Sequence, residues 1–537
     1  MSKICPPSLR LLFHQIETDK VRTWPYIPSG WSIPVLPLAA VIVLLVAVIA
    51  LIVYHHIDSR DDFPTVNRTW ALEPSVFSRL RFAFNSEKIL RGAYQKYKGQ
   101  AYRLARGDVD YIVLPPECVT ELNRLPASGI NSRMCHAFSM TGRLNGMNVV
   151  LKSNLHVKTL LNRITPALPA LLGPASTRIQ ETMQDIFPND SRCWTTIEPM
   201  DLIVRCVSRV IALAAVGEPV CDDPEFVDLI FEHTKSVFTV MMAMRLVPEM
   251  LQSLLVWTLP AKWQLQSSFK RLQSFVGPVV NECKAAKLRS VDQAPSTLLA
   301  WMVAEAKTPV EEDPYVLTEL LAALAAGGTY SSANFIVSAI FDLVAHPVFL
   351  EEIREEFRQK HNEIQGRWDF TALNSLPKLD SAFKETIRLT PGSLTTYSRV
   401  MLQDYILSTG IVLKKGQFIC VPSYARSTDT EIYTDPTSYD ALRAYNASRQ
   451  EHAAQPFKGV YGQDFRWGAG RWACAGRHLA TLVAKFLVVK LLDEYDFQFV
   501  PGSTRPPNSV LHEFVFVHPS ARVMVKQREK RLGISCC

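Results

Sequence analysis

One stretch near the C-terminus decides the fold: Phe465-Arg-Trp-Gly-Ala-Gly-Arg-Trp-Ala-Cys-Ala-Gly-Arg-His-Leu-Ala480. Three glycines surround Cys474, and a largely apolar run from 479 to 492 follows it. Glycine permits tight backbone turns and close approach to a flat partner. The apolar run predicts a helix, and the N–H groups and dipole at its start would favour the thiolate form of the cysteine. A thiolate presented in this way is what a haem iron needs for oxygen chemistry.

This stretch resembles the cysteine-ligand loop of the cytochrome P450 superfamily, which has the pattern aromatic-Gly-x-Gly-x-basic-x-Cys-x-Gly. The matching positions are Trp467, Gly468, Gly470, Cys474 and Gly476. The resemblance implies that Cys474 is the axial ligand of haem iron and that the loop contacts the cofactor. Trp472 stands where the family has a base that binds a haem carboxylate, so we expect Arg471 or another base to do this. A buried structural cysteine is the alternative interpretation.

A second motif, Glu385-Thr-Ile-Arg388, places a carboxylate and a guanidinium on one helix face. Such pairs are usually solvated when isolated. Here the flanking sequence resembles the family's K helix, and Tyr439-Asp-Ala-Leu-Arg443 resembles the segment whose arginine completes a Glu-Arg-Arg triad. The resemblance gives Glu385, Arg388 and Arg443 a structural role behind the haem. The planar guanidinium suits a buried bidentate network of this kind.

Two adjacent glycines, Gly327 and Gly328, lie inside a long helix predicted over 315–344. Glycine within a helix costs roughly 1 kcal/mol against alanine, so the pair needs a reason. A local bulge that makes room for a ligand is one reason. Tight contact with a neighbouring helix is the other.

The family has Ala/Gly-Gly-x-acid-Thr-Thr/Ser in this helix, and two registers are possible. In the register we prefer, Ser331 takes the place of the oxygen-site threonine and Tyr330 replaces the acid. In the rival register Thr329 is the proton relay and Gly328 stands for the acid. Tyrosine, with a reference pKa of about 10, is a poor proton source. We therefore expect proton delivery through water or through a substrate hydroxyl.

Two further positions are candidates for binding the haem carboxylates. Arg399, after Pro391-Gly-Ser-Leu-Thr-Thr-Tyr-Ser398, resembles the family arginine with this role, although a surface strand residue is the alternative. The segment 151–172 lacks the family's W-x-x-x-R pattern, and His156 is the candidate there. The expected walls of the substrate pocket are 129–148, 238–244, 323–330, 393–396 and 513–516.

Composition favours one large folded domain. The chain has 537 residues, of which 48% are hydrophobic and 20% charged, with no repeat or low-complexity linker. Its net charge of +7 suits binding to an acidic redox partner or an anionic membrane. The basic residues are not clustered with interleaved aromatic residues, which argues against nucleic-acid binding. The 11 cysteines lack paired spacing, which predicts reduced thiols. Expected helices include 82–98, 195–216, 269–287, 315–344 and 349–361; expected strands include 101–104, 110–114, 405–407, 418–421 and 515–525.

A twenty-residue segment without charge, 35–54, is long enough to span a bilayer, which takes about 20 apolar residues. We expect a tail over 1–34, the anchor over 35–54, a linker over 55–70, the haem-thiolate domain over 71–530 and a tail over 531–537. The fold class expected from the helix content and the resemblance is α-rich α+β, the cytochrome P450 fold with small sheets around a buried haem, after an N-terminal transmembrane helix.

The orientation of this single-pass anchor is open at the sequence level. More Lys and Arg precede the span than follow it, which favours a cytoplasmic N-terminus and a lumenal domain. The resemblance implies the opposite, an endoplasmic reticulum anchor with a cytosolic domain, which we prefer because the enzyme must meet a cytosolic reductase. A glycan on the sequon Asn67-Arg-Thr69 would contradict this preference.

The resemblance implies a monomeric monooxygenase with haem b, supplied with electrons from NADPH by cytochrome P450 reductase. The chain resembles a filamentous-fungal branch that tailors terpenoids, meroterpenoids and indole alkaloids. Met-rich walls adapt to irregular shapes, so we expect a bulky lipophilic substrate whose C–H bonds are hydroxylated. Two alternatives remain: a haem-thiolate enzyme for desaturation, ring rearrangement or isomerisation, and a non-catalytic haem-binding protein.

Overall fold

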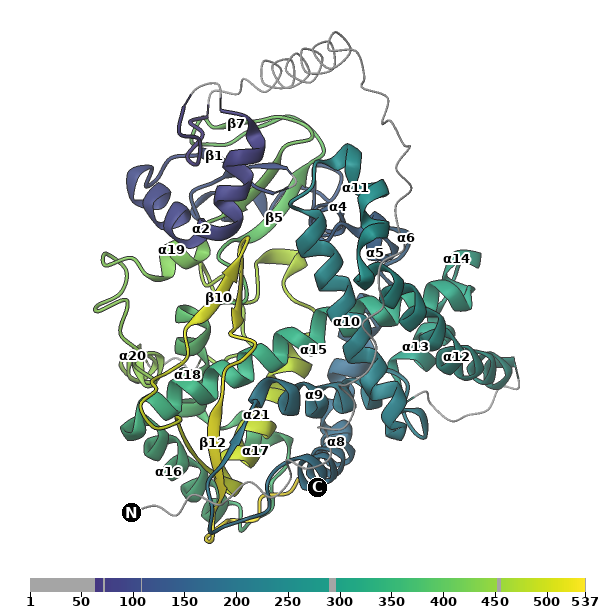
Figure 1. The fold of residues 1–537 in the computed structure, drawn as a ribbon, viewed down its shortest axis with the longest axis vertical. Helices are drawn as coiled ribbons and strands as arrows, with labels where there is room; N and C mark the ends of the chain where they lie inside the picture. The colour runs from purple at the N-terminus through teal and green to yellow at the C-terminus, as the bar shows by residue number, and fades with distance from the viewer. Residues whose placement is uncertain (1–62, 71–72, 108, 289–295, 452–454, 537) are drawn as a thin grey trace, which may run out of the picture.

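The computed structural model describes residues 63–70, 73–107, 109–288, 296–451 and 455–536. This part of the chain is rich in helices and contains small sheets, as the sequence predicts (Figure 1). The predicted anchor, 35–54, lies outside the described residues. The α-helices are α2 (Ser75–Lys96), α3 (Cys118–Leu122), α4 (Ser132–Ser139), α5 (Gly142–Asn145), α6 (Val149–Lys152), α7 (Leu155–Thr159), α8 (Thr165–Ile186), α9 (Pro199–Ala215), α10 (Pro224–Met244), α11 (Glu249–Leu255), α12 (Pro260–Leu288), α13 (Leu298–Glu305), α14 (Pro309–Glu312), α15 (Pro314–Ala345), α16 (Pro347–Glu363), α17 (Phe370–Asn374), α18 (Pro377–Leu389), α19 (Ser423–Ser427), α20 (Arg443–Glu451) and α21 (Arg477–Glu494).

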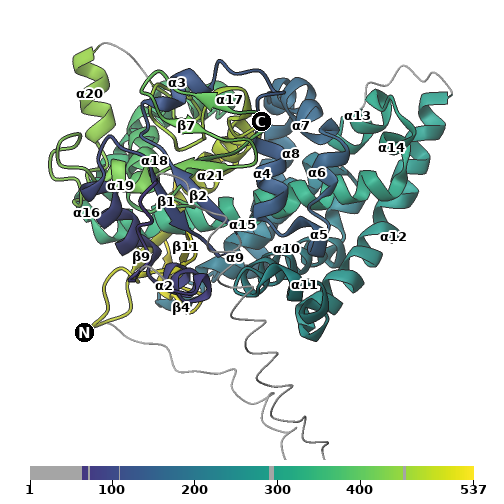
Figure 2. The ribbon, with the colours of Figure 1, turned by 90° about the horizontal axis from the view of Figure 1, so that it is seen from above.

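The strands form four small sheets within the described residues. The largest has the order β1-β2-β8-β5-β3, and the others are β4-β12-β9, β10-β11 and β6-β7. Seen from above, helices α12, α13 and α14 lie on the side of the molecule opposite α16, α18 and α20 (Figure 2). The strands are β1 (Tyr102–Ala105), β2 (Asp110–Val113), β3 (Ile130–Asn131), β4 (Thr195–Ile197), β5 (Thr396–Met401), β6 (Tyr405–Ile406), β7 (Val412–Leu413), β8 (Phe418–Val421), β9 (Tyr495–Gln498), β10 (Asn508–Leu511), β11 (Phe514–Val517) and β12 (Val523–Gln527).

Helix α15 forms the centre of the core. Pro314 occupies its first turn, and the Asp313 side chain caps it by accepting from the Tyr315 N–H at 2.9 Å. It packs against α9, α10, α12 and α21. Among the described helices it is the one long and apolar enough to cross a membrane, but most of its apolar stretch is buried inside the fold. It is therefore the core helix of a folded domain.

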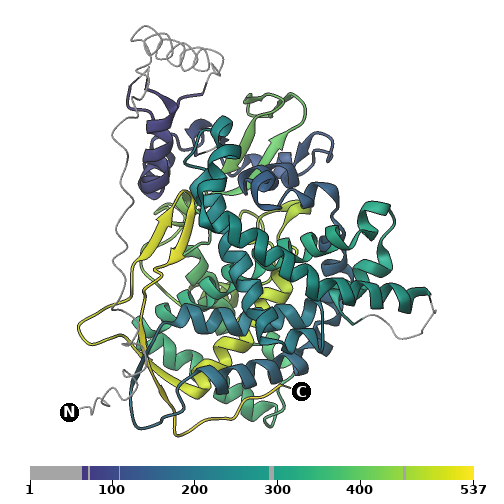
Figure 3. The same ribbon diagram turned by 45° about the vertical axis from the view of Figure 1, so that its right-hand side comes forward.

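The β10–β11 hairpin lies along α15 and below α2 (Figure 3). The Asn334 amide joins it to the core helix, donating to the Val515 carbonyl at 3.3 Å and accepting from the Val517 N–H at 2.7 Å. Residues 515–525, predicted as one terminal strand or pair, divide between two sheets. β11 pairs with β10, while β12 pairs with β4 and β9.

The helix predicted over 195–216 begins later than expected. Thr195–Ile197 instead forms β4, antiparallel to β12, and the helix α9 begins at Pro199. The segment carries β-branched Thr and Ile, and a proline just after it is favoured in the first helical turn. The strand forms because a partner more than 300 residues away pairs with it, which local sequence does not reveal.

The expected linker, 55–70, and the expected C-terminal tail, 531–537, both contain residues that pack on the folded domain. In the expected linker, Thr65 pairs with Arg103, and the Asn67 amide nitrogen donates to the carbonyls of Ser78 at 3.0 Å and Ala105 at 2.7 Å. In the expected C-terminal tail, the Asp493 carboxylate accepts from the backbone N–H groups of residues 532–534. Cys193 is disulfide-bonded, so the expectation of reduced thiols is wrong at this residue.

Candidate active site

The loop before α21 holds Cys474 in a fixed geometry. The Cys474 N–H donates to the Trp467 carbonyl at 2.7 Å, and the Trp467 indole donates to the Phe457 carbonyl at 2.7 Å. Gly468 adopts φ +75° and Gly470 φ +65°, a region that favours glycine. A Cβ at Gly470 would overlap the side chain of Asn123, so packing against the end of α3 also requires this glycine.

Cys474 combines an exposed side chain with an environment that opposes its ionisation. It is the exposed one among the free cysteines of the described segments, yet burial in surrounding protein raises the pKa of its thiol. Both observations together place the sulfur in a recess. The backbone N–H groups of Gly476 and Arg477, and the Arg477 charge, act in the opposite direction. The start of α21 therefore lowers the pKa of the Cys474 thiol, as predicted, but by less than burial raises it. A bound metal ion would displace the thiol proton.

Helix α15 opens to space at the positions that the sequence singled out. Gly327 and Ser331 are exposed although most of the helix is buried. No atom would lie within 4 Å of a Cβ at Gly327, whereas a Cβ at Gly328 would be 3.2 Å from Ile211 on α9. Gly328 therefore fits the predicted helix contact. Gly327 borders open space, but α15 continues as a regular α-helix through both glycines, so the expected local bulge is not present.

The two candidate relay residues have opposite surroundings. The Ser331 hydroxyl donates to the Gly327 carbonyl at 2.7 Å and faces the open space. Thr329 is fully buried, and its hydroxyl forms no hydrogen bond with any residue that the structure describes. This difference favours the register in which Ser331 is the relay.

Tyr330 lies in an aromatic cluster rather than at a charged position. Its ring is 6.2 Å from that of Phe238 on α10 and 5.8 Å from that of Phe516 on β11. Burial raises the pKa of its hydroxyl. Tyr330 therefore keeps its proton at neutral pH, and it joins three of the predicted walls of the substrate pocket.

Arg399 is buried beside the cysteine loop, not on the surface. Its guanidinium lies between the rings of Tyr397, at 4.2 Å, and Trp472, at 5.1 Å. It donates to Ser132 Oγ at 3.0 Å and to the Ala469 carbonyl at 3.4 Å. Its Nε is buried and has no hydrogen-bond partner among the described residues. Burial lowers the pKa of this guanidinium, and an anionic partner would offset that cost.

His156 is a second buried group that lacks a partner. Burial lowers its pKa to about 4, and its Nδ1 has no hydrogen-bond partner in the described chain. His136 and Arg133, on α4, are close enough to lower this pKa further. His136 has an exposed side chain and a pKa lowered by burial, so it also lines a recess. The sequence offered no motif that points to His136 or Arg133.

The Arg471 guanidinium also lies over the Trp472 ring, 5.0 Å from its centre, but this arginine is exposed. It donates to the backbone carbonyls of Asn123, at 3.2 Å, and Leu125, just after α3. These partners hold the loop against α3. They leave Arg399, rather than Arg471, as the guanidinium buried beside Trp472.

The Glu-Arg-Arg residues come together behind the loop. Glu385 accepts from Arg388 at 2.7 and 2.8 Å and from Arg443 at 3.1 Å. Arg388 also donates to the carbonyls of Ser427 and Pro436. Glu385 and Arg388 are buried, so this network fixes the segment before α20 against α18.

The motifs did not indicate a further cluster of charged residues at the turn of the β10–β11 hairpin. Glu513, in the turn of the β10–β11 hairpin, pairs with Arg106 at 2.8 Å and with Arg245, at the end of α10, at 2.9 Å. All three side chains are buried. Burial opposes ionisation of Glu513, but the two guanidinium groups outweigh it and lower its pKa to about 2. Buried arginine is rare without a charged partner, but only the folded chain shows which carboxylate that is.

These residues fit a bound haem. Cys474 supplies a sulfur in a recess, and the open surface at Ser331 lies on α15, a helix that packs against α21. The buried, unpartnered nitrogens of Arg399 and His156 suit the two carboxylates of the porphyrin. The donor set is that of a haem-thiolate site.

Comparison with known proteins gives the same assignment. The family model for Cytochrome P450 matches residues 84–526. Similar proteins include "Cytochrome P450 monooxygenase olcJ" of Penicillium canescens, 28% identical over 88% of this chain and 90% of that protein. They also include "Cytochrome P450 monooxygenase ltmK" of Epichloe festucae, 27% identical over 92% and 94%, and "Cytochrome P450 monooxygenase paxP" of Penicillium paxilli, 27% identical over 87% and 90%. The chain therefore belongs to the cytochrome P450 family and is a cytochrome P450 monooxygenase.

Proposed function

We propose that this protein is a haem-thiolate monooxygenase that hydroxylates a bulky lipophilic secondary metabolite, a terpenoid, meroterpenoid or indole-alkaloid intermediate. Haem b is the expected cofactor, with electrons from NADPH delivered by cytochrome P450 reductase. The relatives come from filamentous fungi, which supports a substrate of fungal secondary metabolism. The observation that carries the proposal is that Ser331 is exposed on the mostly buried helix α15 of a chain that also presents Cys474 in a recess.

Three residues of this chain would hold the cofactor, and a fourth would fix the loop that carries Cys474. Cys474 would bind the iron, and Trp467 would fix the loop through its indole hydrogen bond. Arg399 and His156 would bind the carboxylates through nitrogens that are buried and unpartnered in the described structure. Bound haem supplies the activation of dioxygen and the electron chemistry of oxygen insertion.

Ser331 would move a proton at its Oγ. Its hydrogen bond to the Gly327 carbonyl fixes the hydroxyl and leaves the oxygen lone pairs free to accept from a water molecule. Tyr330 would not replace the missing acid, because burial raises its pKa. The Phe238, Tyr330 and Phe516 rings would instead exclude water and orient an apolar substrate.

A second candidate function is a reaction other than hydroxylation, because Tyr330 occupies the place of the acid that would deliver a proton. Where proton delivery is slow, desaturation, ring rearrangement or isomerisation can compete with hydroxylation. We also propose that the apolar segment 35–54 anchors the protein in the endoplasmic reticulum membrane, with the catalytic domain in the cytosol, and that the protein acts as a monomer.

The test uses the full chain in membranes with NADPH, the reductase and a panel of candidate lipophilic metabolites under ¹⁸O₂. We expect one ¹⁸O atom in the product and a red-shifted carbon monoxide spectrum of the reduced protein. Cys474→Ser should abolish that spectrum, while the matched variant Cys283→Ser should retain it, since Cys283 lies on the distant helix α12. Product without ¹⁸O would favour desaturation or rearrangement, and colourless protein would contradict the haem assignment.

A further inference from the structure

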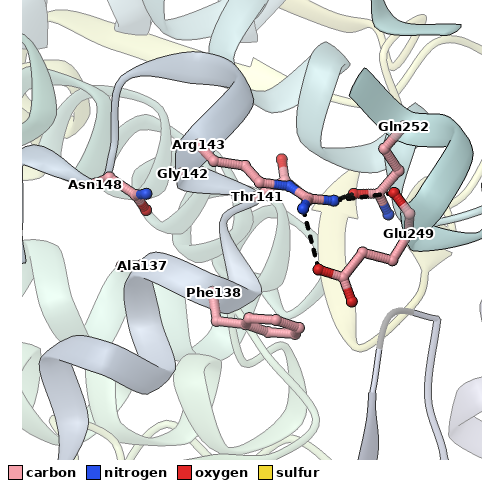
Figure 4. A pocket seen from close by; sticks show the side chains of 8 residues that line it. All are labelled: Ala137, Phe138, Thr141, Gly142, Arg143, Asn148, Glu249 and Gln252. Carbon is pink, nitrogen blue, oxygen red and sulfur yellow. Dashed lines mark hydrogen bonds and ion pairs between the residues drawn. The ribbon is translucent and has the colours of Figure 1, made fainter. Parts of the chain in front are cut away.

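Arg399 lacks the kind of partner that stabilises other arginines of this protein. Arg143, which lines a small pocket between α5 and α11, is an ordinary case. It donates to the Glu249 carboxylate at 3.0 Å and to the Gln252 amide oxygen at 2.8 Å (Figure 4). Arg399 is 4% exposed, and no carboxylate in the described residues pairs with it. Because an unpaired buried charge is costly, other groups must stabilise this guanidinium.

Two aromatic rings take the place of a counter-charge at Arg399. Its Cζ lies 4.2 Å from the centre of the Tyr397 ring and 5.1 Å from the centre of the Trp472 ring. Cation–π contacts of this kind are strongest where water is excluded. The rings carry no net charge, so they stabilise the guanidinium without neutralising it. Its positive charge therefore remains available to an anion.

The backbone of Tyr397 is unusual for a residue inside a strand. Its φ is +56°, whereas the other described non-glycine residues with positive φ lie in turns or bends. The pairing of β5 with β8 shifts register between Thr396 and Arg399. Such an irregularity re-aims side chains. A bulky residue rarely adopts a left-handed conformation, so contacts around the Tyr397 side chain must hold it there.

The Tyr397 hydroxyl provides one such contact. It donates to Asn123 Oδ1 at 3.0 Å, and Asn123 lies at the end of α3. The Asn123 side chain fills the place that a Cβ at Gly470 would take. Its backbone carbonyl accepts from Arg471 at 3.2 Å. Asn123 thus joins Tyr397 to the loop that carries Cys474.

We propose that Tyr397 is a positioning residue for haem binding: through its strained backbone, its ring and its bond to Asn123, it fixes the Arg399 guanidinium beside the cysteine loop. The fixed charge would also raise the reduction potential of bound haem, because a positive charge stabilises the state that holds one more electron. This inference deepens the proposed function and rests on it, since it needs a haem carboxylate as the anion that Arg399 binds.

The first test measures haem transfer from the loaded full chain to excess apomyoglobin. Tyr397→Leu removes the ring beneath Arg399, and we expect haem loss to become about tenfold faster, in the range for a desolvated cation–π contact. Tyr397→Phe keeps the ring and removes only the bond to Asn123, so its effect should be about two- to threefold. Haem loss at the wild-type rate from Tyr397→Leu would overturn the proposal.

A double-mutant cycle shows whether Tyr397 acts through Arg399. In the Arg399→Met background, Tyr397→Leu should change haem loss by less than about twofold, because the guanidinium that it positions is already absent. The midpoint potential should fall in Arg399→Met and fall by less in Tyr397→Leu, with no further fall in the double variant. Additive effects on both quantities would make Tyr397 a structural residue and overturn the proposal.

Tyr495→Leu is the matched control for loss of a buried ring. Tyr495 is 1% exposed, its ring lies 5.3 Å from that of Phe187, and it follows the end of α21 that is remote from Cys474. This variant should lower stability but leave the midpoint potential and haem loss unchanged. A fall in potential equal to that of Tyr397→Leu would show that general loosening of the fold causes the effect, and would overturn the proposal.

A further measurement does not require haem. In urea unfolding of the haem-free full chain, the destabilisation caused by Tyr397→Leu should be smaller in the Arg399→Met background than in the wild type. This coupling in a chain that takes up no haem would sink the proposed function and leave the Tyr397–Arg399 contact standing. Its absence, in a chain with a normal carbon monoxide spectrum, would sink the positioning role and leave the function standing.

Discussion

The guanidinium of Arg399 lies over the indole ring of Trp472, 5.1 Å from the ring centre. Trp472 occupies the loop position at which the family carries a base. An arginine from β5 thus places a buried positive charge beside the indole ring that stands in for that base. The indole also provides a cation–π surface for that charge.

Replacing Arg399 should weaken haem retention. Arg399→Met removes the buried positive charge and leaves a haem carboxylate without its partner, at a cost of about 1–3 kcal/mol. The ratio of haem absorbance to protein after gel filtration should fall. Arg471→Met should retain haem, because its guanidinium binds the carbonyls near α3. Greater haem loss from the Arg471 variant would reverse the assignment.

The two relay candidates should differ in how they affect coupling. Ser331→Ala removes the exposed hydroxyl, so NADPH consumption should continue while product per NADPH falls by about 10²-fold at most, the lower range for a lost proton-transfer group. Thr329→Val replaces a buried, unpartnered hydroxyl with a methyl group and should leave coupling near wild type. Measurement of product, peroxide and NADPH distinguishes them. The reverse ranking would favour the rival register.

The Glu513 cluster should make stability depend on pH. Its folded pKa of about 2 is below the ordinary glutamate value of about 4.3, so its contribution is present above pH 4.3 and is lost as the pH falls towards 2. Glu513→Gln leaves two buried guanidinium groups uncompensated and should lower the free energy of unfolding by about 3–5 kcal/mol at pH 7. Thermal melts should show this difference shrinking between pH 4.3 and 2.

A matched control for that effect is Glu198→Gln, which removes an exposed partner of Arg522. Its effect should stay below about 1 kcal/mol at every pH. A Glu513 variant as stable as the Glu198 variant at pH 7 would contradict the stabilising role of the Arg106–Glu513–Arg245 cluster.

The sequon at Asn67 should carry no glycan in the folded protein. The Asn67 amide nitrogen, the atom that a glycan would modify, is buried and donates to Ser78 and Ala105. Intact-mass measurement should find this residue unmodified. Asn67→Ala should lower the free energy of unfolding by about 1–3 kcal/mol, since it leaves buried backbone groups unpaired. A glycan at full occupancy on a stable, haem-loaded protein would contradict this placement of Asn67.

Much of the fold could be predicted where a local pattern carries the information. The long apolar helix, the hairpin of β1 and β2 and the strand β8 follow from periodicity and turn residues. Thr195–Ile197 was predicted as helix because its strand partner, β12, lies far along the chain. Local propensity does not include such a partner.

The candidate site divides in the same way. Cys474, Ser331 and Glu385 stand in motifs whose spacing is readable without coordinates. Arg106 and Arg245 belong to no sequence motif. Their role as partners of a buried carboxylate is visible only in the folded chain, where both pair with Glu513.

The sequence by itself determined which family this protein belongs to, because one glycine-rich loop and one Glu-x-x-Arg pair encode their geometry over a few neighbouring residues. Only the tertiary structure decided which charges are buried together and which hydroxyl of α15 faces open space. Those properties depend on contacts between segments hundreds of residues apart, and the free energy of a buried charge is set by its partner rather than by its neighbours in the chain.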